Sequence, residues 1–195
     1  SCYPIYLDGQ GECWMNTPDS MENIKLILSD VDGVLTNGAI AFDNNGIETK
    51  QFHIRDGLGI KMWQRAGYQF GILTARTSHI VKVRCQELGI DIVRQGFENK
   101  LPTAVQLVES LHLTMDQVCY VGDDLTDLPV IAAAGLGVAV ADATSEVMDA
   151  ADFITQTKGG AGAVRELIET ILRRTRRWQD LVNQYYSTNP TESHS

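Results

Sequence analysis

Short apolar runs recur along the chain, and most are separated by helix-length segments with one apolar face. Runs that are almost continuously apolar are typical of strands buried on both faces of a parallel sheet. We predict strands at Ile24–Leu28, Tyr68–Leu73, Ile90–Val93, Val118–Val121, Leu136–Val140 and Asp152–Thr155. We predict helices over about 58–66, 78–88, 101–112, 127–134 and 163–182. This alternation indicates an α/β fold with a doubly wound parallel sheet.

One stretch interrupts the alternation, because two strand-like segments flank a strong turn signal. Ala39–Asp43 and Ile47–Phe52 surround Asn44-Asn45-Gly46, and both Asn and Gly tolerate a positive φ. The pattern predicts a β-hairpin that projects between the first strand and the first helix. An isolated hairpin is only marginally stable in water, so we expect its apolar side chains to pack between subunits of a homo-oligomer.

The length of the chain and its recurring alternation of apolar runs and amphipathic segments favour one domain. Residues 1–22 lack sustained periodicity and are expected to form an N-terminal extension, 23–182 the α/β domain and 183–195 a C-terminal tail. No apolar run approaches the ~20 residues that a membrane-spanning helix needs. The N-terminal residues also lack the basic and apolar regions of a signal peptide. We therefore expect no membrane partner.

Charge and cysteine usage narrow the function classes further. The net charge of −9 argues against a nucleic-acid partner, which would favour a basic protein. The four cysteines show no metal-site spacing, and we interpret Cys85 and Cys119, which lie in apolar segments, as reduced packing thiols. Reduced thiols favour a cytoplasmic location.

Two acidic clusters follow two of the predicted strands. Asp30 and Asp32 come directly after the first strand, and Gly122-Asp123-Asp124-Leu125-Thr126-Asp127 follows the strand at Val118–Val121. Ligands of doubly wound sheets bind at the carboxyl ends of the strands, so the clusters converge if these strands are neighbours. Crowded carboxylates need a cation, and hard oxygen ligands suit Mg²⁺.

Two further residues fit between the acidic clusters. Thr74 ends the second core strand, where its hydroxyl could donate a hydrogen bond to a phosphoryl oxygen. Lys100 begins a predicted helix, where its charge opposes the helix dipole unless it faces an anion.

Taken in order, these motifs resemble the four motifs of the haloacid dehalogenase (HAD) superfamily of phosphohydrolases. The resemblance extends from about Ile24 to Leu172. Three further segments resemble the 3-deoxy-D-manno-octulosonate 8-phosphate (Kdo 8-phosphate) phosphatase family: Phe52–Lys61, Val138–Ala143 and Gly159–Glu166. Ala75 departs from the glycine that this family usually carries between the threonine and the arginine.

The resemblance implies a mechanism and a place in lipopolysaccharide synthesis. Asp30 would attack phosphorus to form an aspartyl-phosphate, and Asp32 would act as general acid and then base. Mg²⁺ would be held by Asp30, the backbone carbonyl of Asp32 and Asp123. Asp124 and Asp127 would act as orienting partners, while Thr74 and Lys100 would stabilise the transferring phosphoryl group. The residues expected to bind substrate are Asp32, His53, Arg55, Asp56, Gly57, Lys61, Arg76, Arg84 and Lys100.

The spacing of the motifs indicates a capless enzyme. Positions 33–73 hold the hairpin and one helix, and positions 75–99 hold one helix and one strand, which leaves no room for a cap domain. Arg55, Lys61, Arg76 and Arg84 supply cations that suit a sugar phosphate bearing a carboxylate. The resemblance implies a homotetramer, in which the glycine-rich segment at 158–162 can reach the site of a neighbouring subunit.

Three other classes of protein share part of this pattern. A receiver-type signalling domain places its paired acids before the phosphorylated aspartate and its lysine last, whereas here the Asp-Asp cluster comes last. A non-catalytic HAD-like interaction domain would have lost the nucleophile, but Asp30 is present. A phosphatase of another sugar-acid phosphate, of the sialic acid or KDN 9-phosphate type, stays open on the sequence.

Overall fold

A six-stranded parallel sheet forms the centre of the computed structural model, which describes residues 6–7, 13–14 and 19–187. Its strand order is β10-β9-β8-β3-β6-β7, with every neighbouring pair parallel. The strands are β3 (Leu26–Ser29), β6 (Gln69–Thr74), β7 (Ile92–Gln95), β8 (Val118–Gly122), β9 (Leu136–Ala139) and β10 (Phe153–Ile154). All six predicted strands are therefore present, and the two that precede the acidic clusters, β3 and β8, are neighbours.

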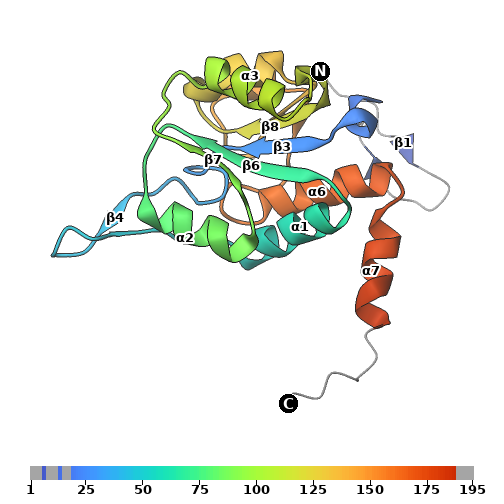
Figure 1. The fold of residues 1–195 in the computed structure, drawn as a ribbon, viewed down its shortest axis with the longest axis horizontal. Coiled ribbons are helices and arrows are strands. Elements are labelled where there is room, and N and C mark those ends of the chain that lie inside the picture. Colours follow the sequence, from blue (N-terminus) through green and yellow to red (C-terminus); the bar gives the residue numbers. More distant parts are fainter. Residues whose placement is uncertain (1–5, 8–12, 15–18, 188–195) are drawn as a thin grey trace.

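Helices cover both faces of the sheet, as the alternating pattern predicts (Figure 1). One layer contains α1 (Ile54–Arg65), α2 (His79–Leu88) and α6 (Ala163–Arg174). The other contains α3 (Lys100–Ser110), α4 (Leu128–Ala133) and α5 (Ser145–Ala150). Single 3₁₀ turns lie at Asp19–Asn23, Met115–Gln117 and Leu125–Asp127. The fold is the predicted doubly wound α/β architecture.

One helix prediction was wrong, and one helix was not predicted. The helix predicted over 163–182 is broken, because Arg176 has a φ of 58° and separates α6 from α7 (Trp178–Tyr186). A left-handed residue cannot continue a right-handed helix. Helix α5 was not predicted, since its six residues are too few to show a clear helical period.

Burial explains why the strands read as continuous apolar runs. All residues of β3, β8 and β9 are buried, because helices cover both faces of the sheet. Cys85 and Cys119 are free and buried, as expected for packing thiols, and burial raises the pKa of the Cys85 thiol to about 11. Cys2 lies outside the described residues.

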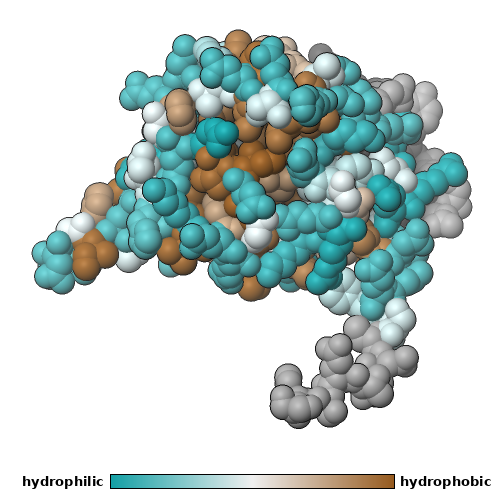
Figure 2. All heavy atoms as spheres, viewed as in Figure 1, coloured by the Kyte–Doolittle hydropathy of each residue, from teal (hydrophilic) through white to brown (hydrophobic). Residues whose placement is uncertain are grey.

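The predicted hairpin projects from the body of the molecule (Figure 1). Its paired strands, β4 (Ala41–Phe42) and β5 (Glu48–Thr49), are shorter than predicted. Ile40, Phe42 and Ile47 have exposed fractions of 55%, 63% and 60%. Hydrophobic side chains accordingly appear at the surface of the projection in Figure 2. A second two-stranded pair, β1 (Tyr6–Leu7) and β2 (Cys13–Trp14), lies near the N-terminus.

The ends of the chain bear on the predicted domain limits. Met21, in the segment expected to be an extension, is fully buried in the core, and α7 runs past residue 183. Most of the predicted extension and of the predicted tail lies outside the described residues. The division at residues 22 and 182 stays a prediction.

Candidate active site

The carboxyl ends of β3, β6 and β8 bring the motif residues to one edge of the sheet. Asp30 follows β3 directly, and its backbone N–H donates to the carbonyl of Val121 in β8 (3.0 Å). Thr74 is the last residue of β6, on the other side of β3, and is 2% exposed. Because parallel strands end at the same edge, residues more than 90 positions apart in the sequence share one site.

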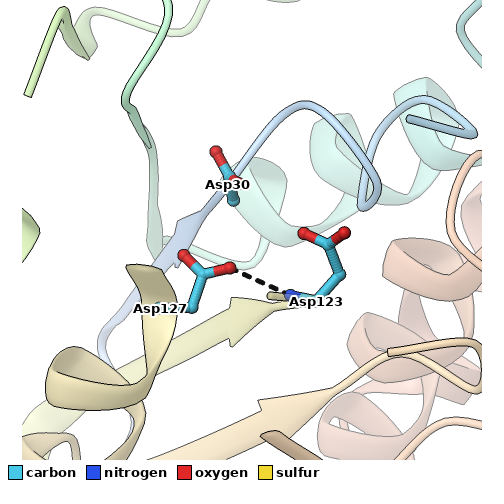
Figure 3. Close-up of side chains that lie close together, drawn as sticks. All are labelled: Asp30, Asp123 and Asp127. Carbon is cyan, nitrogen blue, oxygen red and sulfur yellow. Dashed lines mark hydrogen bonds between the residues drawn. The ribbon is translucent and has the colours of Figure 1, made fainter. Parts of the chain in front are cut away.

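Three carboxylates cluster at this edge (Figure 3). One oxygen each of Asp30, Asp123 and Asp127 lies within 4.8 Å of the others. Gly33 permits this approach: it has a φ of +94°, and a β-carbon there would overlap the carboxylate of Asp123. The glycine that follows Asp32 therefore lets the two acidic clusters meet.

Both carboxylate oxygens of Asp127 accept hydrogen bonds from neighbouring residues. Its Oδ1 accepts hydrogen bonds from Lys100 Nζ and from the Tyr120 hydroxyl, both at 2.6 Å. Its Oδ2 accepts from the backbone N–H groups of Asp123 (3.0 Å) and Asp124 (3.3 Å). With both oxygens engaged, Asp127 is suited to orient Lys100 and the loop that carries Asp123.

Lys100 lies between the two acidic clusters, at the first residue of α3. Its ammonium is 3.0 Å from Asp30 Oδ2 and 2.6 Å from Asp127 Oδ1, and its side chain is 0% exposed. Burial alone would lower the pKa of Lys100, but the charges of Asp30 and Asp127 outweigh it and raise that pKa. A permanent cation therefore lies beside the carboxylate of Asp30.

The donor set at this edge fits a hard divalent cation. Oδ1 of Asp30 and Oδ1 of Asp123 are buried without a hydrogen-bond partner, although buried carboxylate oxygens are normally satisfied. Burial raises the pKa of Asp30 to about 6, with Lys100 acting in the opposite direction, and burial together with nearby carboxylates raises the pKa of Asp123 to about 7. These two free carboxylate oxygens, one from Asp30 and one from Asp123, are ligands of the kind that Mg²⁺ prefers.

The side chain of Asp32 belongs to a ring of four charged side chains, of which the sequence analysis predicted two. Its Oδ1 contacts Lys50 Nζ, and its Oδ2 is 3.9 Å from Arg76 Nε. Glu48 closes the ring, with Oε1 at 2.6 Å from Arg76 Nη2 and 3.4 Å from Lys50 Nζ. Arg76 was predicted to belong to the site, whereas Glu48 and Lys50 were missed.

The missed pair carried a sequence signal. Glu48 and Lys50 are two positions apart on a strand-like segment, so their side chains leave the same face. Ile47 and Thr49 leave the opposite face and are exposed. The alternation of the hairpin could have indicated a charged face turned toward the site.

The other predicted substrate-binding residues lie in two neighbouring regions. His53, Asp56, Gly57 and Arg84 line a mostly apolar cavity against α1 and α2. Asp56 is buried there, and its Oδ1 accepts a hydrogen bond from the backbone N–H of Arg165 in α6. Arg55 and Lys61 are exposed on α1, and Arg55 lines an open groove beside the start of α6. Within the described residues of a single chain, only Arg76 of the four predicted specificity cations pairs with Asp32.

Comparisons with known proteins agree with this geometry. The family model of haloacid dehalogenase-like hydrolases matches residues 84–168. The 3-deoxy-D-manno-octulosonate 8-phosphate phosphatase KdsC of Escherichia coli is 46% identical over 151 residues, covering 77% of this chain and 80% of that protein. Its counterpart from Haemophilus influenzae is 44% identical over 153 residues, covering 78% and 85%.

Solved structures give the same result. The enzyme of the same name from Moraxella catarrhalis, crystallised with magnesium, phosphate and KDO, has a TM-score of 0.84 at 37% identity, over 85% of this chain and 95% of that one. A cobalt-bound phosphatase of this kind from Haemophilus influenzae has a TM-score of 0.82 at 40% identity, over 87% and 100%. The chain belongs to the HAD superfamily of hydrolases and, within it, to the Kdo 8-phosphate phosphatase family.

Proposed function

We propose that this protein is a Mg²⁺-dependent phosphatase that hydrolyses Kdo 8-phosphate to Kdo and inorganic phosphate. The observation that carries the proposal is the pairing of Asp30 with Lys100 at the edge where Asp123 also offers a free oxygen. This combination provides a nucleophile, a fixed cation and metal ligands in one site. The relatives that are 46% and 44% identical to this chain are named for this phosphatase activity.

In the proposed mechanism, a carboxylate oxygen of Asp30 attacks phosphorus as the bond from phosphorus to the sugar oxygen breaks. Asp32 gives its proton to the departing oxygen, and then takes a proton from the water that hydrolyses the aspartyl-phosphate. Lys100, fixed by Asp127, and the hydroxyl of Thr74 stabilise charge on the phosphoryl oxygens. When bound, Mg²⁺ would be held by Asp30, Asp123 and the backbone carbonyl of Asp32, and would neutralise further phosphoryl charge.

Substrate preference is proposed to follow from the cations around the site. Arg76 is 38% exposed at its side chain and reaches the ring around Asp32, so it can meet the polyol or carboxylate of a sugar acid. The Moraxella catarrhalis relative was crystallised with a KDO molecule, which supports an eight-carbon sugar acid. Arg55, Lys61, Arg84 and His53 stay proposed substrate contacts, which a neighbouring subunit could bring closer.

A phosphate-release screen tests the proposed substrate. Kdo 8-phosphate, sialic acid 9-phosphate, KDN 9-phosphate and simple hexose phosphates are compared with Mg²⁺ present. We expect the highest kcat/KM for Kdo 8-phosphate and loss of release when a chelator removes the metal. A higher kcat/KM for either nine-carbon substrate would transfer the proposal to that sugar acid.

We further propose that the active unit is a homotetramer. The exposed Ile40, Phe42 and Ile47 on the hairpin and the short, open strands β4 and β5 support it, because pairing between subunits would bury both. Light scattering on the wild type and on Phe42→Glu tests it: a tetramer that Phe42→Glu dissociates is expected. A wild-type monomer that is fully active at nanomolar concentration would contradict it.

The proposed setting is lipopolysaccharide synthesis in the cytoplasm. It rests on the family resemblance and on the free, buried thiols of Cys85 and Cys119. None of the helices in the described part of the chain combines the length and the apolar character of a membrane span. Fractionation of cells that produce the native protein, with Kdo 8-phosphate phosphatase activity as the marker, tests the location.

A further inference from the structure

Lys50 is a buried cation that the mechanism does not yet use. Its side chain is 1% exposed, and its ammonium contacts Asp32 Oδ1 and lies 3.4 Å from Glu48 Oε1. A buried ammonium is costly unless carboxylates compensate it. Lys100 already supplies the cation beside Asp30, so Lys50 serves a different group.

That group is Asp32, and the contact is one-sided. Lys50 holds Oδ1, whereas Oδ2 has Arg76 Nε at 3.9 Å, beyond hydrogen-bond distance. One carboxylate oxygen of Asp32 is therefore fixed and the other is available to a ligand. Side-chain torsions of Asp are otherwise broad, so this contact decides how the carboxylate is oriented.

The hairpin holds Lys50 in place through the rest of the ring. Glu48 on β5 pairs with Arg76 at 2.6 Å, and Arg76 follows β6. The ring contains two cations and two carboxylates, so its charges balance. The projecting hairpin is thus tied to the core sheet at the residue proposed as general acid.

We propose that Lys50 is a positioning residue that orients Asp32 toward the leaving oxygen. This rests on the proposed function of Asp32. As the phosphorus–Asp30 bond forms and the phosphorus–sugar oxygen bond breaks, the proton of Asp32 goes to the sugar oxygen. The transfer leaves Asp32 as a carboxylate, and Lys50 takes no part in the proton transfer.

Two substrates with different leaving groups distinguish this role of Lys50 from a merely structural one. A sugar alkoxide needs a proton to depart, whereas p-nitrophenolate departs without one. The constant kcat/KM reports the steps up to the departure of the leaving group. Loss of Lys50 should therefore lower kcat/KM for Kdo 8-phosphate and leave kcat/KM for p-nitrophenyl phosphate nearly unchanged.

The experiment compares Lys50→Met, Asp32→Asn and the double variant on both substrates with saturating Mg²⁺. Misplacing a catalytic group can cost about 10²-fold, so we expect Lys50→Met to lower kcat/KM for Kdo 8-phosphate by about 10²-fold. For p-nitrophenyl phosphate the change should stay within about threefold, because no general acid is needed. In the Asp32→Asn background, Lys50→Met should have no further effect, since its partner is already gone.

One control variant and one alternative substitution accompany this experiment. Lys82→Met removes an exposed lysine of α2 and should leave both constants unchanged. If Lys50→Met folds poorly, the uncharged but polar Lys50→Gln is measured with the same expected pattern. Equal losses on both substrates, or independent effects of the Lys50 and Asp32 changes, would overturn the proposal for Lys50. If Asp32→Asn itself does not distinguish the two substrates, the proposed role of Asp32 fails instead.

Discussion

Replacing Lys100 by methionine removes the cation that compensates two buried carboxylates. The ammonium lies 3.0 Å from Asp30 Oδ2 and 2.6 Å from Asp127 Oδ1, with a side chain that is 0% exposed. Breaking a buried ion pair by removing one partner costs about 3–5 kcal/mol, because the remaining charge is left uncompensated. We expect Lys100→Met to lower the free energy of unfolding by about 3–5 kcal/mol at pH 7. This corresponds to a fall in Tm of roughly 6–20 °C.

The loss should depend on pH, with a sign that follows from Asp30. Its pKa is raised by burial to about 6, and the charge of Lys100 acts to lower it, so the variant should have a higher folded-state pKa than the wild type. A carboxyl whose folded pKa exceeds its unfolded value near 3.8 destabilises the fold as pH rises between the two values. Lys100→Met should therefore lose more stability at pH 7 than at pH 5.

Urea unfolding in the presence of a chelator, at both pH values, measures this effect. The matched control is Lys82→Met, the same substitution at an exposed position of α2, which should change stability by no more than about 0.5 kcal/mol. A loss below about 1 kcal/mol for Lys100→Met, or equal losses at the two pH values, would refute the electrostatic account of the site.

Three further predictions concern the metal, the glycine-rich loop and the substrate. Without metal, the free energy of unfolding should fall between about pH 4 and pH 7, because folding raises the pKa values of Asp30 and Asp123 to about 6 and about 7. Saturating Mg²⁺ should remove this fall. Urea titrations with and without chelator check both statements. Gly160→Ala should reduce kcat because its β-carbon would overlap backbone in the loop after Asp32. Gly67 also has a positive φ (+88°, against +67° for Gly160) but faces open space, so Gly67→Ala should keep kcat. Arg76→Met should lower kcat/KM roughly 10–100-fold more for Kdo 8-phosphate than for p-nitrophenyl phosphate, and equal losses would assign Arg76 to phosphoryl binding or structure.

The glycine-rich segment contacts the loop after Asp32 within its own chain. Gly159 and Gly160 pack against residues 33–37, and Gly160 N–H donates to the Val34 carbonyl (2.9 Å). Its reach into a neighbouring subunit stays a prediction. Sequence reveals the backbone freedom of these glycines and not which backbone they approach.

Much of the fold and the core of the site could be predicted, since they depend on local patterns. Continuous apolar runs mark strands buried on both faces, and acids placed directly after two such strands must meet when those strands are neighbours. Asp30, Thr74, Lys100 and Asp123 do lie at one edge of the sheet. The order of these motifs carried the family resemblance.

What could not be predicted depends on contacts between distant segments. The pairing of Lys50 with Asp32 requires the path of the hairpin, which two strand-like segments and a turn do not define. Arg84 lies over the Phe52 ring and lines the cavity beside α1 and α2, a placement that its charge, which suits a sugar acid, does not define. The break between α6 and α7 follows from the left-handed backbone of Arg176, which the arginine-rich helical pattern of this segment does not indicate.

Detection of the phosphoenzyme tests the central claim most directly. Wild-type protein and Asp30→Asn are mixed with Kdo 8-phosphate and Mg²⁺, quenched in acid before steady state, and digested for mass spectrometry. We expect the added mass of one phosphoryl group on the wild-type peptide that contains Asp30, no such mass in Asp30→Asn, and essentially no phosphate release by that variant. Phosphorylation at another residue, or substantial Mg²⁺-dependent phosphate release by properly folded Asp30→Asn, would contradict the account.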